Sequence, residues 1–177
     1  MIRNVHERVV DAPIERLGAL LDGLGRKGDR LWPSRNWPPM VLDRPVSAGG
    51  EGGHGAIRYH VTEYEPGARV RFAFDPATGI EGAHELSLDA LSNGRCRMRH
   101  VLVGRARGRM RLLFPLAIEP LHDAVVEDMF DNAERETTGT LATPHSGLCG
   151  CACSGGSSAK GRRRREVNRP GESRRGW

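Results

Sequence analysis

Alternation of apolar and charged residues dominates the middle of the chain. Four segments repeat with a period of two, which is typical of strands with one buried and one solvated face. These segments are Ala56–Glu65, Ala68–Asp75, Ile80–Leu91 and Arg95–Arg105. Turn sequences lie between them, Pro66-Gly67 and Ser92-Asn93-Gly94 among others. The pattern predicts a meander of antiparallel strands whose apolar face must pack against another element.

Before this meander the pattern changes several times. Residues 2–10 alternate loosely and predict an edge strand, whereas residues 14–24 place Ile and Leu at helical spacing and predict a short amphipathic helix. Prolines around Trp32 and Trp37 exclude a regular helix there, and we expect the two indoles to form a lid over one end of the core. The glycine-rich stretch 49–55 lacks the Gly-Lys-Ser/Thr ending of a phosphate-binding loop and is interpreted as a flexible connection.

The predicted partner of the sheet is a C-terminal helix. Prolines interrupt the first part of this apolar stretch, so the regular helix is expected to begin at about Pro120. Its spacing predicts that Leu121, Val125 and Met129 face the sheet and that Glu127 lies on the solvent side. The predicted fold class is therefore α+β, with an antiparallel sheet curled around a long C-terminal helix and an internal apolar cavity.

The wall of this cavity follows from the strand alternation. We expect it to be lined by Tyr59, Val70, Phe72, Phe74, His84, Leu86, Met98, His100, Leu102, Leu121, Val125 and Met129. Two histidines, His84 and His100, interrupt an apolar face. If Leu91 pairs with Arg95, the two imidazoles are diagonal neighbours in adjacent strands. They are then either core histidines bonded within the protein, a polar anchor for a ligand, or an acid–base group.

Charge is divided unevenly along the chain. Residues 1–136 contain 19 Arg/Lys and 20 Asp/Glu, whereas residues 137–177 contain 8 and 2. The basic character therefore belongs to the second segment, and specific nucleic-acid binding is not expected. We predict a single domain at 1–136 followed by a disordered Gly/Ser/Arg-rich basic tail at 137–177. Three cysteines in the tail, Cys149, Cys151 and Cys153, lack the spacing of a structural zinc site.

Several classes of protein are not expected. No apolar run is long enough to span a membrane and no signal-peptide pattern precedes the first strand, so we expect a cytoplasmic location. Cys96 is the only cysteine in the predicted domain, so no disulfide framework is expected. A metal site would need His122 and Asp123 to face inward, where Leu121 and Val125 are predicted instead. No metal and no cofactor are therefore expected.

Four segments and the order of elements carry a family resemblance. The segments are Trp32–Pro45 (WPSRNWPPMVLDRP), Gly52–Tyr59 (GGHGAIRY), Tyr64–Phe74 (YEPGARVRFAF) and Pro120–Asp128 (PLHDAVVED). Over residues 1–136 the chain resembles the bacterial SRPBCC (START/Bet v 1-like) family, often labelled polyketide cyclase/dehydrase. The resemblance implies a helix-grip fold. It implies no catalytic residues, because this superfamily includes carriers, cyclases, hydrolases, antitoxin-like proteins and co-chaperones.

Three functions remain open on the sequence alone. The leading hypothesis is a carrier or sensor that binds a small hydrophobic molecule in the internal pocket. The alternatives are a polyketide cyclase/dehydrase-like enzyme with His84 or His100 as acid or base, and a protein-interaction module. A carrier needs an open apolar cavity, and an enzyme needs a polar cluster with a perturbed pKa. An interaction module is compatible with a filled core.

Overall fold

Strands form where apolar and charged residues alternate, and helices form where apolar residues recur every three or four positions. The structure, a computed structural model, describes residues 1–142. Its strands are β1 (Ile2–Val10), β2 (Met40–Leu42), β3 (Glu51–His54), β4 (Ile57–Glu65), β5 (Arg69–Phe74), β6 (Ile80–Ala90) and β7 (Cys96–Ala106). Its helices are α1 (Ile14–Asp22), α2 (Met110–Leu113) and α3 (Glu119–Thr138), with short helical turns η1 (Pro76–Thr78), η2 (Ser92–Gly94) and η3 (Phe114–Ile118).

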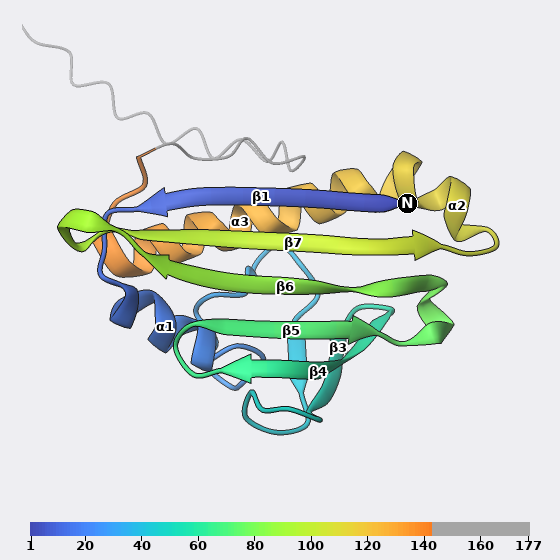
Figure 1. Cartoon of the computed structure of the whole chain (residues 1–177), viewed down its shortest axis with the longest axis horizontal. Helices are drawn as coiled ribbons and strands as arrows, with labels where there is room; N and C mark the ends of the chain where they lie inside the picture. The colour runs from blue at the N-terminus through green and yellow to red at the C-terminus, as the bar shows by residue number, and fades with distance from the viewer. Residues whose placement is uncertain (143–177) are drawn as a thin grey trace, which may run out of the picture.

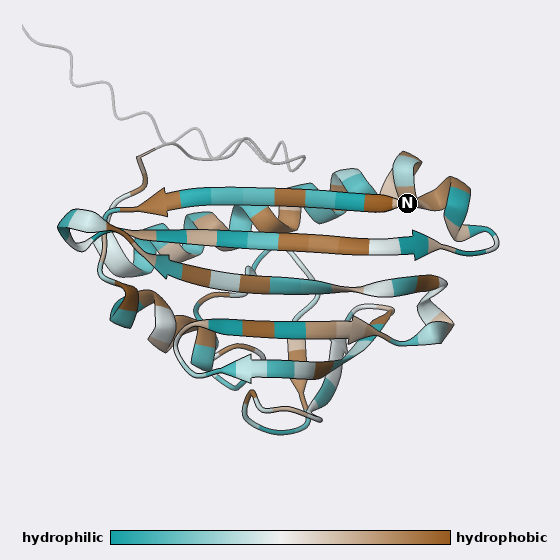
Figure 2. Ribbon diagram, in the orientation of Figure 1, coloured by the Kyte–Doolittle hydropathy of each residue, from teal (hydrophilic) through white to brown (hydrophobic). Residues whose placement is uncertain are grey.

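All the strands form one sheet that curves around α3. Their order is β1-β7-β6-β5-β4-β3-β2, and each neighbouring pair is antiparallel. Figure 1 shows α3 running behind β1 and β7, with α1 at one end of the sheet and α2 at the other. Hydrophobic and hydrophilic residues alternate along β5 in Figure 2, as in a strand with one buried face. The predicted fold class is confirmed, and β1 is an edge strand as predicted.

The β6–β7 hairpin has the predicted register. The N–H of Leu91 donates a hydrogen bond to the carbonyl of Arg95 over 2.8 Å. His100 is paired with Leu86, two positions from His84 on the same strand. The two imidazoles are therefore diagonal neighbours on the concave face, as the turn sequence predicted.

The glycine-rich stretch 49–55 contains a strand, so its interpretation as a flexible connection was wrong. β3 pairs with β2 on one side and with β4 on the other. A Cβ atom at Gly52 would collide with the carbonyl oxygen of Val41, and one at Gly53 with that of Ile57. Glycine is unfavourable inside strands, but here it is needed because the neighbouring backbones approach so closely.

The helix α3 is buried over more of its surface than the single predicted stripe. Its buried residues are Ala124, Val125, Val126, Met129, Phe130, Asp131, Ala133 and Thr137. Leu121 is 45% exposed, and Glu127 forms ion pairs with β1 instead of facing solvent. Val125 and Met129 are buried as predicted, and the difference lies in Glu127, whose partners belong to β1.

The end of α3 lies close to the predicted domain boundary. The helix runs to Thr138, and Gly139 caps it with a φ of 77° and an N–H bond to the carbonyl of Arg135. Positions 143–177, which hold most of the predicted tail, lie outside the described residues. Among residues 1–142, no helix is long and apolar enough to cross a membrane.

Gly18 brings α1 into direct contact with the β4–β5 turn. A Cβ atom at this position would lie 2.6 Å from the carbonyl oxygen of Gly67 and 2.8 Å from its Cα. One turn later, Asp22 accepts hydrogen bonds from the Gly67 N–H at 2.7 Å and from the Tyr64 hydroxyl at 2.8 Å. These bonds hold the turn against the helix, so the close approach cannot relax freely.

We expect Gly18→Ala to lower the free energy of unfolding by about 1–3 kcal/mol, because the added methyl group overpacks this contact. Alanine is otherwise the better helix former, so the sign of the effect is diagnostic. Ala19→Gly, on the exposed side of α1, should cost about 1 kcal/mol from helix propensity alone. Urea unfolding measures both variants, and a stabilised Gly18→Ala would contradict the contact.

Candidate functional site

An apolar cavity of about 320 Å³ lies between the concave face of the sheet and α3. Of the residues predicted to line it, those on its wall are Phe72, Phe74, His84, Leu86, His100, Leu102, Leu121, Val125 and Met129. Ala56 and Leu121 lie on the wall and are also exposed, so the cavity communicates with solvent. Its size is at the lower end of the range of small-molecule sites, roughly 300–1,000 Å³.

Three of the predicted wall residues do not reach the cavity. Val70 and Met98 are buried in the packed cluster that also contains Leu17 and Leu21 of α1. Side chains of α1 fill this end of the space between the sheet and α3. Strand alternation shows which residues face that space but not which part of it a helix fills. Tyr59 is buried in the same cluster.

The proline-rich segment covers one side of the cavity. Trp32 and Trp37, the predicted lid residues, both lie on the cavity wall. The indole N–H of Trp32 donates to the carbonyl of Pro38 over 2.9 Å. The indole N–H of Trp37 donates to the Asp128 carboxylate over 2.8 Å and so fastens this segment to α3.

Sequence reasoning missed two histidines of the cavity wall, His54 and His122. His122 was assigned to the outer side of the helix because only the apolar stripe of Leu121 and Val125 was expected to face the sheet. His54 lies in the glycine-rich stretch that was not recognised as a strand. His54 is flanked by Gly53 and Gly55. Because glycine has no side chain, the sequence shows no apolar–polar alternation from which the face of the sheet occupied by His54 could be predicted.

Aromatic and imidazole rings form a continuous row that connects the rings of the cavity wall through the buried Tyr59. Successive ring centroids lie 4.7 Å apart for Trp32–His54, 5.7 Å for His54–Tyr59, 5.1 Å for Tyr59–His84, 5.5 Å for His84–His100 and 5.0 Å for His100–His122. The row brings four of the chain's seven histidines to one apolar cavity. Such a row gives an otherwise apolar cavity several polar atoms at defined positions.

The pair His84–His100 forms the centre of this row. Nδ1 of His84 lies 3.3 Å from Nε2 of His100, so the N–H of one imidazole donates a hydrogen bond to the nitrogen of the other. The other nitrogens, Nε2 of His84 and Nδ1 of His100, are buried without a hydrogen-bond partner in the protein. A neutral imidazole has one donor and one acceptor nitrogen. Whichever ring donates, the two outer nitrogens are therefore one free donor and one free acceptor.

Burial keeps the imidazoles of the cavity neutral. Desolvation, reinforced by the charges of His122 and His54, lowers the pKa of His84 from 6.5 to about 3. Desolvation likewise lowers the pKa of His100 well below 6.5. The pKa of His54 falls to about 4 through burial and the nearby Arg58 guanidinium. At neutral pH the cavity therefore contains uncharged donor and acceptor groups and no fixed charge from these rings.

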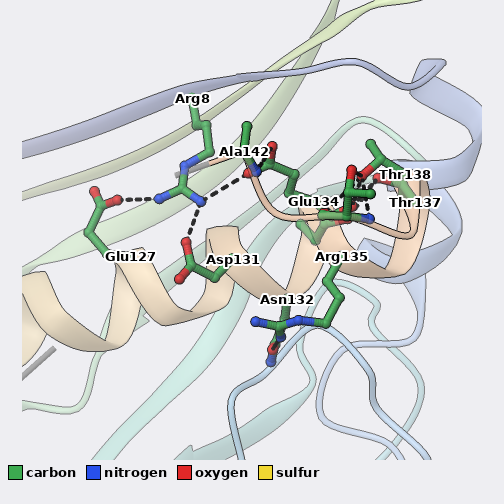
Figure 3. Close-up of polar contacts among 11 residues, drawn as sticks. Arg8, Glu127, Asp131, Asn132, Glu134, Arg135, Thr137, Thr138 and Ala142 are labelled. Atoms are coloured by element: carbon green, nitrogen blue, oxygen red, sulfur yellow. Dashed lines mark hydrogen bonds and ion pairs between the residues drawn. The ribbon is translucent and has the colours of Figure 1, made fainter. Parts of the chain in front are cut away.

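A polar seam closes the side of the cavity between β1 and α3. Carboxylates of α3 that recur along one face of the helix meet polar residues at alternate positions of β1. Arg8 reaches Glu127 and Asp131, and lies 3.6 Å from Glu134, as Figure 3 shows. Burial alone would lower the pKa of Arg8, but its hydrogen bonds to these acids outweigh burial and raise it. His6 bonds to Glu127 as well, over 2.7 Å.

Comparison with known proteins relates the chain to solved structures only. No family model matches the chain, and no curated protein matches it. Norcoclaurine synthase from Thalictrum flavum is similar in structure, with a TM-score of 0.56, 11% identity, and coverage of 76% of this chain and 92% of that one. Ara h 8.0201 has a TM-score of 0.58, 12% identity, and coverage of 78% and 99%.

A third similar structure is the di-domain ARO/CYC BexL from the BE-7585A biosynthetic pathway. Its TM-score is 0.56 and its identity 17%, and the match covers 78% of this chain and 47% of that one. At these identities the likeness concerns the fold. The helix-grip fold implied by the sequence resemblance is confirmed.

Proposed function

We propose that this chain, which has the helix-grip fold of the SRPBCC (START/Bet v 1-like) superfamily, binds a small hydrophobic molecule that carries one polar group. The apolar body of the ligand fills the cavity between the sheet and α3. Its polar group bonds to the His84–His100 pair. The protein then acts as a carrier or sensor for this molecule.

The unpaired ends of the His84–His100 pair carry this proposal. Leaving a buried donor or acceptor without a partner costs roughly 1–3 kcal/mol. The pair leaves one of each, Nε2 of His84 and Nδ1 of His100 in either order. A hydroxyl group both donates and accepts, and a carbonyl group accepts, so either chemistry relieves part of this cost. The surrounding wall, which includes Phe72, Leu86 and Val125, favours an apolar body.

An acid–base reaction is the second candidate, in line with the names of two similar structures, norcoclaurine synthase and ARO/CYC BexL. The observation in its favour is the 3.3 Å contact between the two rings. If a substrate gave a proton to the outer nitrogen of one ring, the shared proton would move across the contact and the outer nitrogen of the other ring would release its proton to the same substrate. Efficient general bases have a pKa near the working pH. The pKa of His84, about 3, makes its neutral ring a weak base. Binding is therefore the stronger proposal.

Binding is tested with an apolar fluorophore, N-phenyl-1-naphthylamine, whose emission rises in apolar surroundings. We expect saturable binding to the full chain. Val125→Trp should weaken it at least about tenfold, because the larger side chain occupies the cavity that Val125 lines.

The matched control is Val103→Trp, at a position on β7 that is 38% exposed and does not line the cavity. This variant should bind the fluorophore as the unmodified chain does. Both variants are first compared in urea unfolding, so that loss of the fold is not mistaken for loss of binding. Equal binding by Val125→Trp and the unmodified chain would place the fluorophore outside the cavity and contradict the proposal.

A further inference from the structure

The seam between β1 and α3 has an excess of negative charge at the end nearest the cavity. Asp123 accepts a hydrogen bond from the Asn4 side chain over 2.7 Å and lies 3.1 Å from Nε2 of His6. Within residues 1–142, Asp123 has no ion pair with an arginine or a lysine. The guanidinium of Arg8 forms ion pairs with Glu127, Asp131 and Glu134, which lie further along α3.

His6 lies between two carboxylates. Its Nδ1 is 2.7 Å from Glu127 and its Nε2 is 3.1 Å from Asp123. A neutral His6 that donates from Nδ1 to Glu127 turns the lone pair of Nε2 toward the Asp123 carboxylate. Two acceptors at that distance need a cation or a proton between them.

His122 supplies another nitrogen at the same place. Its Nδ1 is buried without a hydrogen-bond partner and lies 3.8 Å from the Asp123 carboxylate. The side chains of His6 and His122 are 14% and 17% exposed and that of Asp123 is 43% exposed, so the two imidazoles are largely enclosed and the carboxylate is open to solvent. The ligand atoms of His6, His122 and Asp123 all lie within 4.8 Å of one another.

We propose that Nε2 of His6, Nδ1 of His122 and a carboxylate oxygen of Asp123 bind a divalent transition metal ion of the zinc type. Two imidazoles and one carboxylate are ligands of such ions, at about 2.0–2.2 Å each. Tetrahedral ligands at this length lie about 3.3 Å apart. The observed separations need only small side-chain movements to reach this spacing.

The surroundings of these residues match those of bound metal ions. Metal-binding histidines usually donate their second N–H to a carboxylate, which fixes the ring and its tautomer. Glu127 occupies that position on Nδ1 of His6. Asp123 is 43% exposed, so water can supply the fourth ligand that zinc requires, and His122, which also lies on the cavity wall, places the metal site next to the cavity. The expectation that no metal binds depended on Leu121 and Val125 facing inward in place of His122 and Asp123. Leu121 and Val125 do line the cavity, and His122 lines it beside them.

The experiment is a zinc titration of the full chain after treatment with a chelator. Cys149, Cys151 and Cys153 are replaced together by serine in every sample, because thiolates in the tail would compete for zinc. Isothermal titration calorimetry should find one zinc ion per chain. Zinc should also raise the thermal unfolding temperature, since it binds the folded state.

Two variants test the assignment of the ligands. His122→Phe keeps a ring in the cavity wall and should weaken zinc binding at least about tenfold. His6→Gln removes the second imidazole and should have a comparable effect. His60→Gln, at an exposed position of β4, is the matched control and should bind zinc as the parent does.

Failure of the metal site and failure of the proposed ligand binding give different results in these experiments. Absence of one-to-one binding in the parent, or equal zinc affinity in His122→Phe and the parent, would overturn the metal site. Fluorophore binding is measured with chelator present, so it reports on the cavity alone. A chain that binds the fluorophore and not zinc would retain the proposed function and lose only this inference.

Discussion

Arg8→Met should destabilise the domain by about 2–4 kcal/mol, the largest loss that we expect from a single surface-accessible side chain. Arg8 neutralises three acids of α3, Glu127, Asp131 and Glu134, and its own side chain is 17% exposed. Removing one partner of a buried ion pair typically costs about 3–5 kcal/mol. Water reaches this seam in part, so we place the cost lower. Urea unfolding at neutral pH measures it.

Arg107→Met is the matched control for this loss. Arg107 pairs with Glu81 at 2.6 Å, but the two side chains are 57% and 56% exposed. Exposed pairs of this kind contribute little, so the free energy of unfolding should stay nearly unchanged. If the two variants lose equal stability, the seam does not hold β1 to α3 as its contacts indicate.

Acid should destabilise the domain progressively as the pH falls below about 6.5. The pKa of His84 is about 3 and that of His54 about 4 in the folded state, against 6.5 for a free side chain. As the pH falls, the unfolded chain takes up protons that the folded chain excludes, so stability is intact above pH 6.5 and lost below it. Each histidine contributes about 1.4 kcal/mol per pH unit. Down to pH 4 the two together remove roughly 3–6 kcal/mol, a large part of a typical domain's stability.

The measurement is the slope of unfolding free energy against pH between 6.5 and 4, with chelator present. His84→Phe should reduce this slope by about 1.4 kcal/mol per pH unit, because one excluded proton is removed. His60→Phe, exposed on β4, should leave the slope unchanged. An unaltered slope in His84→Phe would mean that this ring takes up its proton equally in both states.

The sheet could be predicted from the sequence because strand alternation is a local property. The spacing around Leu91 and Arg95 fixed the β6–β7 register, and with it the diagonal placement of His84 and His100. The strand in the stretch 49–55 could not be predicted, because glycine gives no alternation to read.

The wall contributed by α3 could be predicted only in part. Val125 and Met129 line the cavity as expected, but His122 does so as well. The apolar spacing of Leu121, Val125 and Met129 predicted one inward stripe, whereas the inward face of α3 is wide enough to include His122 as well. The seam was missed for a second reason. The sequence alone predicts that Glu127 faces solvent, because its partners His6 and Arg8 belong to a strand that is distant in the sequence.

The pairing of a polar ligand group with the two imidazoles can be measured directly with a matched pair of ligands. Naphthalene and 2-naphthol share an apolar body and differ by one hydroxyl group. Calorimetric titration gives the affinity of each for the unmodified chain and for His100→Phe. Lost hydrogen bonds in a desolvated site cost about 1–3 kcal/mol, so 2-naphthol should bind the variant roughly ten- to a hundredfold more weakly. Naphthalene should bind both proteins with nearly the same affinity. If the substitution weakens both ligands by the same factor, or if neither ligand binds, His100 does not anchor a polar group and the cavity is not the site we propose.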